Sequence, residues 1–215
     1  RQQVVDAIKA GEEAVKTLRE KDRNFQLGEM LTNLSAFYEL VDDDENAAKS
    51  AKEATEFAPN NITTLTNLWA SQMRLGKYAA AYDTAGRLIH LGAKLPGKIR
   101  QLESLQMNSE PGRLLQEAAS DPETVGELSR DPRFFELKAH AQFETHQIDA
   151  AFDTIKEGLT RFREDARLYC ARASLYEHLG QTSSAQEDIE RAESFGANEP
   201  RTVVHVAMFQ FHHRD

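Results

Sequence analysis

The sequence contains little of several residue types, and each scarcity excludes a class of protein. Cys170 is the single cysteine among 215 residues, so neither an internal disulfide nor a zinc site of several thiolates can form. With 6 prolines and 11 glycines, the chain is neither collagen-like nor of low complexity. Its 26 Lys and Arg face 35 Asp and Glu, a net charge of -9 and the wrong sign for coating nucleic acid. We expect a folded chain that does not bind nucleic acid.

Long apolar runs are missing as well. The longest uncharged stretch, 57–73, contains Pro59 and several asparagines, so it cannot cross a lipid bilayer as a helix. The first six residues hold no apolar run of signal-peptide length, and the chain does not begin with Met. We therefore expect a fragment or processed form without a membrane span, and its compartment, cytoplasmic or periplasmic, stays open.

What the sequence does contain is an internal repeat. The tetrapeptide Leu31–Leu34 recurs letter for letter as Leu65–Leu68, a displacement of 34 residues. The same displacement relates Ala47 to Ala81, Ala51 to Ala85, Ala139 to Ala173, Ala151 to Ala185 and Ile155 to Ile189. Apolar and small residues fall at helical spacing on both sides of a short break in each unit, which predicts two helices and a turn.

Small residues and helix breakers refine this prediction. An alanine at the position shared by Ala81 and Ala185 suits a close crossing of two helices, because a larger side chain would push the pair apart. Gly76 and Gly180 are placed to end first helices, since glycine tolerates left-handed geometry. Breakers at the ends of the second helices are Pro59, Gly92 and Gly196.

These positions resemble the tetratricopeptide repeat family, whose period is 34 residues. The resemblance implies an all-α fold, a right-handed α-solenoid of stacked antiparallel helix pairs. Four units fit it, at 28–61, 62–95, 132–165 and 166–199. The departures from the family pattern are Trp69 at a usually small position, Lys138 and Arg172 at a usually apolar one, and His146 in place of a common glycine.

Three segments lie outside these units. Residues 1–27 predict an N-terminal helix from about Gln2 to Glu20, either a partial repeat or a cap, and 200–215 predict a C-terminal helix of the same kind. Residues 96–131 predict a degenerate repeat with a short extra helix over 123–129; a hinge between two repeat pairs is the alternative. Asp121 and Asp131, each followed by proline, are expected to cap helices there.

The search for chemistry gives no site. The segment from Asp42 to Glu53 has oxygen ligands at calcium-loop spacing, but Ala47 stands where the loop needs glycine. His140 and His146 fall on different helix faces, and His178 lies two turns, about 12 Å, from Cys170 along one predicted helix. We therefore expect no metal, no cofactor and no catalytic residue, so any catalysis would lie outside this segment.

The resemblance instead implies a binding groove, because the first helices of such arrays line a concave surface. Positions two, five, six, nine and twelve of each repeat are the ones that usually face a ligand. They are Glu29, Thr32, Asn33, Ala36 and Glu39; Thr63, Thr66, Asn67, Ala70 and Met73; Arg133, Glu136, Leu137, His140 and Phe143; and Arg167, Cys170, Ala171, Ser174 and Glu177. Asn33 and Asn67 stand out because an amide both donates to and accepts from an extended peptide; a plain exposed helix face is the alternative.

Two charge patterns indicate which kinds of partner to expect. The carboxylate clamp of chaperone-binding relatives needs Lys and Arg at several groove positions, and here they hold residues such as Thr32, Ala36 and Cys170, so we do not expect a chaperone tail. Residues 61–110 carry 6 basic and 3 acidic side chains, net +3. Within them Lys94, Lys98 and Arg100 predict a basic patch for an acidic partner, or a solvated face.

The sequence thus predicts a scaffold or adaptor that binds a partner protein or peptide through the concave groove, the partner including the rest of its own polypeptide. The alternative is a regulatory or substrate-recruiting arm of a larger enzyme or of a secretion or exopolysaccharide assembly, for instance a glycosyltransferase.

Overall fold

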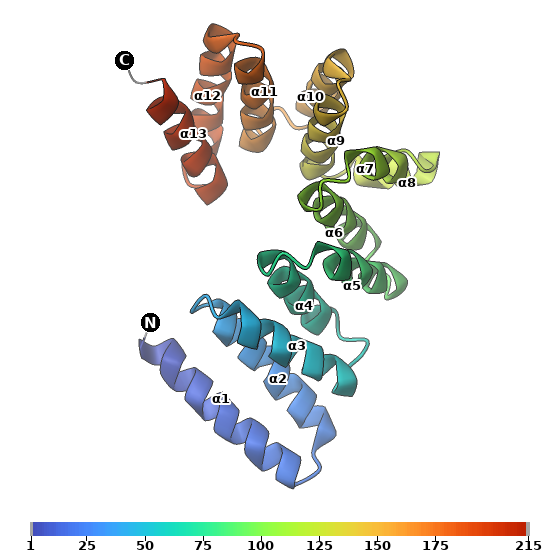
Figure 1. Cartoon of the computed structure of the whole chain (residues 1–215), viewed down its shortest axis with the longest axis vertical. Coiled ribbons are helices and arrows are strands. Elements are labelled where there is room, and N and C mark those ends of the chain that lie inside the picture. The colour runs from blue at the N-terminus through green and yellow to red at the C-terminus, as the bar shows by residue number, and fades with distance from the viewer. Residues whose placement is uncertain (1, 214–215) are drawn as a thin grey trace. The chain divides into compact units, whose positions relative to one another are not determined.

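The computed structural model describes residues 2–213, and every regular element in that range is a helix. The chain divides into two compact units, 1–108 and 109–215. The boundary falls inside the segment 96–131 that matched the repeat pattern least. Figure 1 shows helices that follow one another through short turns, each packed against its neighbours within a unit.

The first unit contains six helices. They are α1 (Gln2–Glu20), α2 (Asn24–Glu39), α3 (Asp44–Phe57), α4 (Ile62–Arg74), α5 (Tyr78–His90) and α6 (Lys94–Met107). Helices α2 and α3 form one antiparallel pair and α4 and α5 the next, as the 34-residue period predicts. Helix α6 packs on α5 and begins at Lys94, so Pro96 lies in its first turn, where a missing N–H costs no intrahelical hydrogen bond.

The second unit contains the remaining helices of the described range. They are α7 (Pro111–Ala118), α8 (Pro122–Leu128), α9 (Pro132–Glu144), α10 (Ile148–Arg161), α11 (Ala166–His178), α12 (Thr182–Gly196) and α13 (Pro200–His212). The predicted caps are confirmed: Asp121 Oδ1 accepts from Thr124 N at 2.8 Å and Asp131 Oδ1 from Arg133 N at 3.0 Å. The short extra helix is confirmed to within a residue as α8.

The close helix crossings are those that the repeat predicted. Ala47, Ala81, Ala151 and Ala185 all have 0% of their surface exposed. Each lies on the second helix of its pair, so the backbones approach with only a methyl group between them. Around them pack the aliphatic and aromatic side chains of the core, including Leu65, Leu88, Phe134 and Ile155.

The turns between paired helices share one backbone feature. Gly76 and Gly180 have φ of +68° and +70°, as expected for residues that end first helices. At the equivalent turns, Asp42 and His146 adopt φ of +62° and +61° without being glycine. Helix α12 ends at Gly196, as predicted, but Gly196 lacks the positive φ of Gly92. A Cβ there would lie 2.5 Å from the Cβ of Ala166, so the need for glycine is steric.

Candidate partner-binding site

The first helices of unit 1, α2, α4 and α6, are joined by side-chain hydrogen bonds. The hydroxyls of Thr32 and Thr64 are 2.6 Å apart and hydrogen-bonded, and Asn67 Nδ2 donates to the Thr32 carbonyl at 3.2 Å. Between α4 and α6, Trp69 Nε1 donates to Ser104 Oγ at 3.2 Å. We call the surface of these three helices the first-helix face of unit 1. Its backbone is fixed from helix to helix before any partner binds.

The predicted groove residues on this face differ in what they offer a partner. Asn33 is exposed, and its amide has no partner in the described part of the chain. Ala36 and Ala70 are half-buried and carry only methyl groups. Glu39 accepts from Ser71 Oγ at 3.3 Å and lies 3.1 Å from Arg74 Nη2. A ligand therefore meets one free amide, two small residues and one carboxylate already paired with an arginine.

Two predicted groove residues form hydrogen bonds within the chain and are therefore not free to bind a partner. Thr32 is only 6% exposed and donates to the Gly28 carbonyl. Asn67 is half-buried and donates to α2, so it is not a second free amide like Asn33. Thr66 and Met73 are half-buried, and the Met73 sulfur lies 3.5 Å from Ser104 Oγ.

The three residues of the predicted basic patch differ in their exposure. Lys94, the first residue of α6, is exposed, whereas Lys98 is half-buried. Arg100 is half-buried and places its guanidinium over the Trp69 ring, 5.2 Å from the centroid, while Nη1 donates to Pro96 O at 3.3 Å. The Arg100 side chain is therefore held against its own unit.

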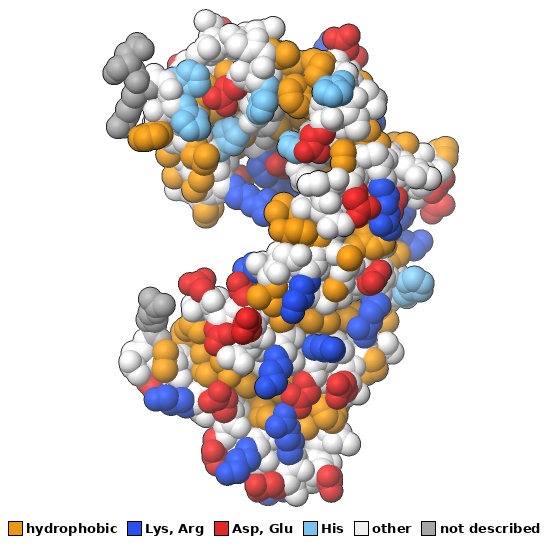
Figure 2. Space-filling model, in the orientation of Figure 1, with side chains coloured by type: hydrophobic (Ala, Val, Ile, Leu, Met, Phe, Trp, Pro, Cys, Tyr) orange, Lys and Arg blue, Asp and Glu red, His pale blue; other side chains and the backbone are white. Residues whose placement is uncertain are grey.

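The first helices of unit 2, α9, α11 and α13, form an equivalent face rich in histidine. His178 packs edge-on against Phe143 with ring centroids 5.1 Å apart, and His205 Nε2 lies 3.2 Å from Ser174 Oγ. His213 Nδ1 is 3.8 Å from the Glu177 carboxylate. Exposed His140 lies 3.5 Å from Glu144. Figure 2 shows histidine side chains gathered on this unit. Sequence reasoning placed Phe143, Ser174 and Glu177 here but missed two histidines. His178 lies outside the five usual ligand positions, and His205, 34 residues after Ala171, holds position six of a segment that was not assigned as a repeat.

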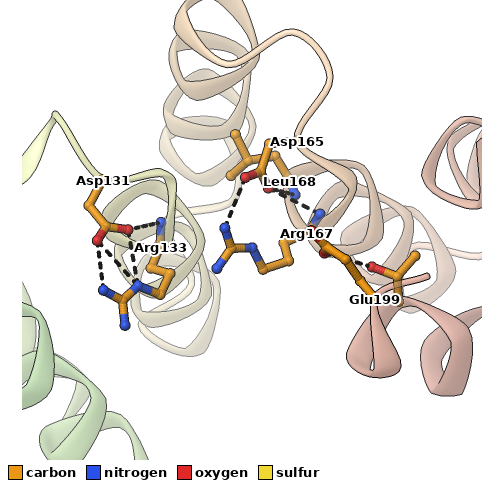
Figure 3. A network of polar contacts seen from close by, with 7 residues as sticks. Asp131, Arg133, Asp165, Arg167, Leu168 and Glu199 are labelled. Atoms are coloured by element: carbon orange, nitrogen blue, oxygen red, sulfur yellow. Dashed lines mark hydrogen bonds and ion pairs between the residues drawn. The ribbon is translucent and has the colours of Figure 1, made fainter. Parts of the chain in front are cut away.

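The arginines at position two are paired with the carboxylates that cap their own helices. Arg133 donates from Nη2 to Asp131 Oδ2 at 2.7 Å, and Arg167 from Nη2 to Asp165 Oδ2 at 3.0 Å (Figure 3). Burial opposes the charged form of Asp131, but the hydrogen bonds and charge of Arg133 outweigh it and lower the pKa of that carboxyl. The positive charge that these two arginines offer a partner is therefore partly neutralised by the capping aspartates.

Cys170 is buried, 6% exposed, on α11. Burial, aided by the carboxylates of Glu136 and Glu199, raises the pKa of its thiol to about 12. The residue therefore carries a neutral thiol that a partner cannot reach in this conformation. Within residues 2–213, no three His, Cys, Asp or Glu side chains are grouped so that they could hold a metal ion. No helix in this range is long and apolar enough to cross a membrane.

Comparisons with known proteins match this architecture. The family profile described as tetratricopeptide repeat matches residues 166–195, which lie in α11 and α12. No curated protein sequence matches the chain. Among solved structures, a thermophilic TPR protein of Thermus thermophilus is similar with a TM-score of 0.64 and 16% identity, over 86% of this chain and 99% of that one. MamA from Desulfovibrio magneticus gives 0.60 and 14%, over 80% and 97%. YrrB, described as a TPR protein with an unusual peptide-binding site, gives 0.54 and 13%, over 91% and 98%.

One helix pair is thus recognised by its sequence and the other pairs by their fold. By its fold the chain is similar to tetratricopeptide repeat proteins, and its described residues form helices that stack in pairs.

Proposed function

We propose that the first-helix faces bind an extended segment of a partner protein, which makes the chain a scaffold or adaptor. The observation that carries this proposal is Asn33: its amide is exposed and unbonded, whereas Asn67, at the same position of the next repeat, donates to the Thr32 carbonyl. A free amide both donates to and accepts from a peptide backbone. Ala36 on α2 and Ala70 on α4 are small and leave room for that backbone to approach.

Fixed geometry supports the same conclusion. The hydrogen bonds between α2, α4 and α6 hold the face in place, so a partner does not have to order it on binding. The family is one of interaction modules, and YrrB is a relative by fold whose description includes a peptide-binding site. In unit 2 the equivalent face offers Phe143 and the histidines, and an aromatic side chain beside polar groups suits a peptide side chain.

Site-specific photocrosslinking tests the proposal. A photoreactive amino acid replaces Asn33 on α2 or, as the control, exposed Asp83 on α5, and each variant of the 215-residue chain is irradiated in extract of the source cell. We expect a specific adduct from position 33 and none from position 83. The adduct is identified by mass spectrometry, and the purified partner is titrated against the chain.

The titration compares Asn33→Ala with the wild type. One lost hydrogen bond should weaken binding by about 0.5–1.5 kcal/mol, and Asn33→Arg should weaken it further by filling the space beside Ala36. Adducts only from position 83, or unchanged affinity in both Asn33 variants, would show that the partner uses a different surface.

A further inference from the structure

Unit 1 has a cleft that is lined by none of the residues proposed above. It has a volume of about 1010 Å³, and its walls come from α3, from α4 and from the first turn of α5. The residues that line it are Glu45, Asn46, Ala48, Lys49, Lys52, Leu68, Gln72, Leu75, Lys77 and Ala80. We call it the second-helix cleft. Its size is at the upper end of the range for small-molecule pockets, about 300–1,000 Å³, and suits a short peptide segment.

Basic groups dominate the rim of this cleft. Lys49, Lys52 and Lys77 are exposed, and in the part of the chain that the structure describes none of their ammonium groups forms an ion pair. Glu45 is the single acidic residue among the lining residues. The lining is therefore net +2, three lysines minus one glutamate, in a chain whose net charge is -9.

Further hydrogen-bond donors belong to residues that line the cleft. Helix α5 begins after Lys77 without a side-chain cap, so the N–H groups of its first turn, which reaches Ala80, are not satisfied by a capping side chain. Gln72 uses its amide oxygen to accept from Thr84 Oγ1 at 2.8 Å, which leaves its amide nitrogen as a donor. Cationic side chains and helix N–H groups both favour a ligand that supplies carboxylate oxygens.

Apolar groups among the lining residues add a second requirement. Leu68, Leu75, Ala48 and Ala80 contribute hydrocarbon between the lysines. A free inorganic anion would leave this hydrocarbon uncovered, whereas a peptide with both acidic and aliphatic side chains covers it and pairs with the lysines. We propose that the second-helix cleft is a docking site for an acidic, leucine-bearing protein segment, separate from the residues Asn33, Ala36 and Ala70 of the proposed groove.

Fluorescence anisotropy with the whole 215-residue chain tests this proposal. The probe is a labelled dodecapeptide of Asp and Glu with two leucines, and its comparison is the same peptide with Asn and Gln in place of the acids. We expect saturable binding of the acidic peptide, weakened by added salt, and no binding of the neutral one. Failure of the acidic peptide to bind overturns the proposal.

Two matched triple variants locate the site. Lys49→Gln, Lys52→Gln and Lys77→Gln together should weaken binding about tenfold, since three exposed pairs of about 0.5 kcal/mol each are lost. The control, Lys9→Gln, Lys16→Gln and Lys21→Gln, makes the same charge change on and after α1 in the same unit, and less than a twofold change is expected. Equal weakening by both triples means attraction to overall charge and overturns the proposal.

A third variant and a second probe test the kind of occupant. Ala80→Trp narrows the cleft without changing charge, and its exposed position should leave the melting temperature unaltered. We expect it to weaken peptide binding at least threefold, and unchanged binding contradicts docking within the cleft. An oligonucleotide that competes for the same lysines with equal affinity would show a general anion site and would also overturn the assignment to a protein segment.

Discussion

Arg172 on α11 donates two hydrogen bonds to the carboxylate of Asp188 on α12, from Nε at 2.6 Å and from Nη2 at 2.7 Å. The arginine occupies a position that is usually apolar in the family, and Asp188 is only 2% exposed. Hydrogen bonding by Asp188, against an opposing effect of burial, raises the pKa of Arg172. This ion pair therefore joins α11 to α12 at a position where an aliphatic side chain usually makes the contact between the two helices.

Removing one partner of this pair should be costly. Arg172→Leu leaves the Asp188 carboxylate buried without its counter-charge, and we expect the free energy of unfolding to fall by about 3–5 kcal/mol. The double variant Arg172→Leu with Asp188→Leu should recover most of that loss, because no buried charge remains. Urea denaturation measures all three proteins, and a double variant as unstable as the single one would contradict this account.

The turn at His146 should accept glycine with a gain in stability. A residue other than glycine with φ of +61° is strained by about 1–2 kcal/mol, and replacing it with glycine removes this strain. Part of the gain is lost because glycine also makes the unfolded chain more flexible and therefore more stable. We expect His146→Gly to stabilise by about 0.5–1 kcal/mol. Gly180→Ala at the equivalent turn, with φ of +70°, should destabilise by about 1 kcal/mol. Thermal melts of the two variants should shift in opposite directions.

Enlarging a buried alanine at a helix crossing should destabilise the fold. Ala81→Leu and Ala185→Leu each introduce three carbon atoms where the native side chain has no exposed surface, and we expect a loss of about 1–3 kcal/mol. Ala79→Leu, on the exposed side of α5, is the control and should change stability by less than about 0.5 kcal/mol. Similar denaturation midpoints for Ala79→Leu and Ala81→Leu would contradict the packing described.

His205 should make stability depend on pH. Its burial between α11 and α13 lowers the pKa of the imidazole, although the nearby Glu177 carboxylate acts in the opposite sense. In the unfolded chain the pKa returns to the ordinary value of about 6.5, so the unfolded state binds more protons as pH falls. This contribution is therefore present above about pH 6.5 and is lost as pH falls from there through the lower folded-state value. Urea denaturation at several pH values should show this loss in the wild type and a smaller one in His205→Gln.

The sequence predicted the fold well because the residues that recur in the repeat each indicate a feature of their own helix or turn. A recurring alanine such as Ala81 indicates a close helix crossing even when the partner helix is not known. Gly76 indicates a left-handed turn without any information on the rest of the fold. The sequence also predicted that α12 ends at Gly196, but it did not predict that the close approach of Ala166 requires a residue without a side chain at this position.

The candidate site was predicted less completely, because a repeat position gives the face of a residue but not its bonds. Asn33 and Asn67 hold the same position, yet only Asn67 has a carbonyl of an adjacent helix within reach. Cys170 shares a position with Thr32, and both are buried. The sequence did not predict the lysines of the second-helix cleft, because Lys77 follows Lys52 by 25 residues. Only the packing of α3, α4 and α5 brings these lysines to one cleft.

The hydrogen bonds between α2 and α4 bear on how unit 1 unfolds. In a stack of repeats, stability is approximately the sum of each repeat's own stability and the interactions at its interfaces with its neighbours. Here α2 cannot leave α4 without exposing the buried Thr32 and Thr64 hydroxyls and breaking the bond from Asn67 to the Thr32 carbonyl. Opening one helix pair therefore disturbs its neighbour, so the two pairs are coupled into a larger cooperative element, within which the amides of both should exchange with solvent through shared openings.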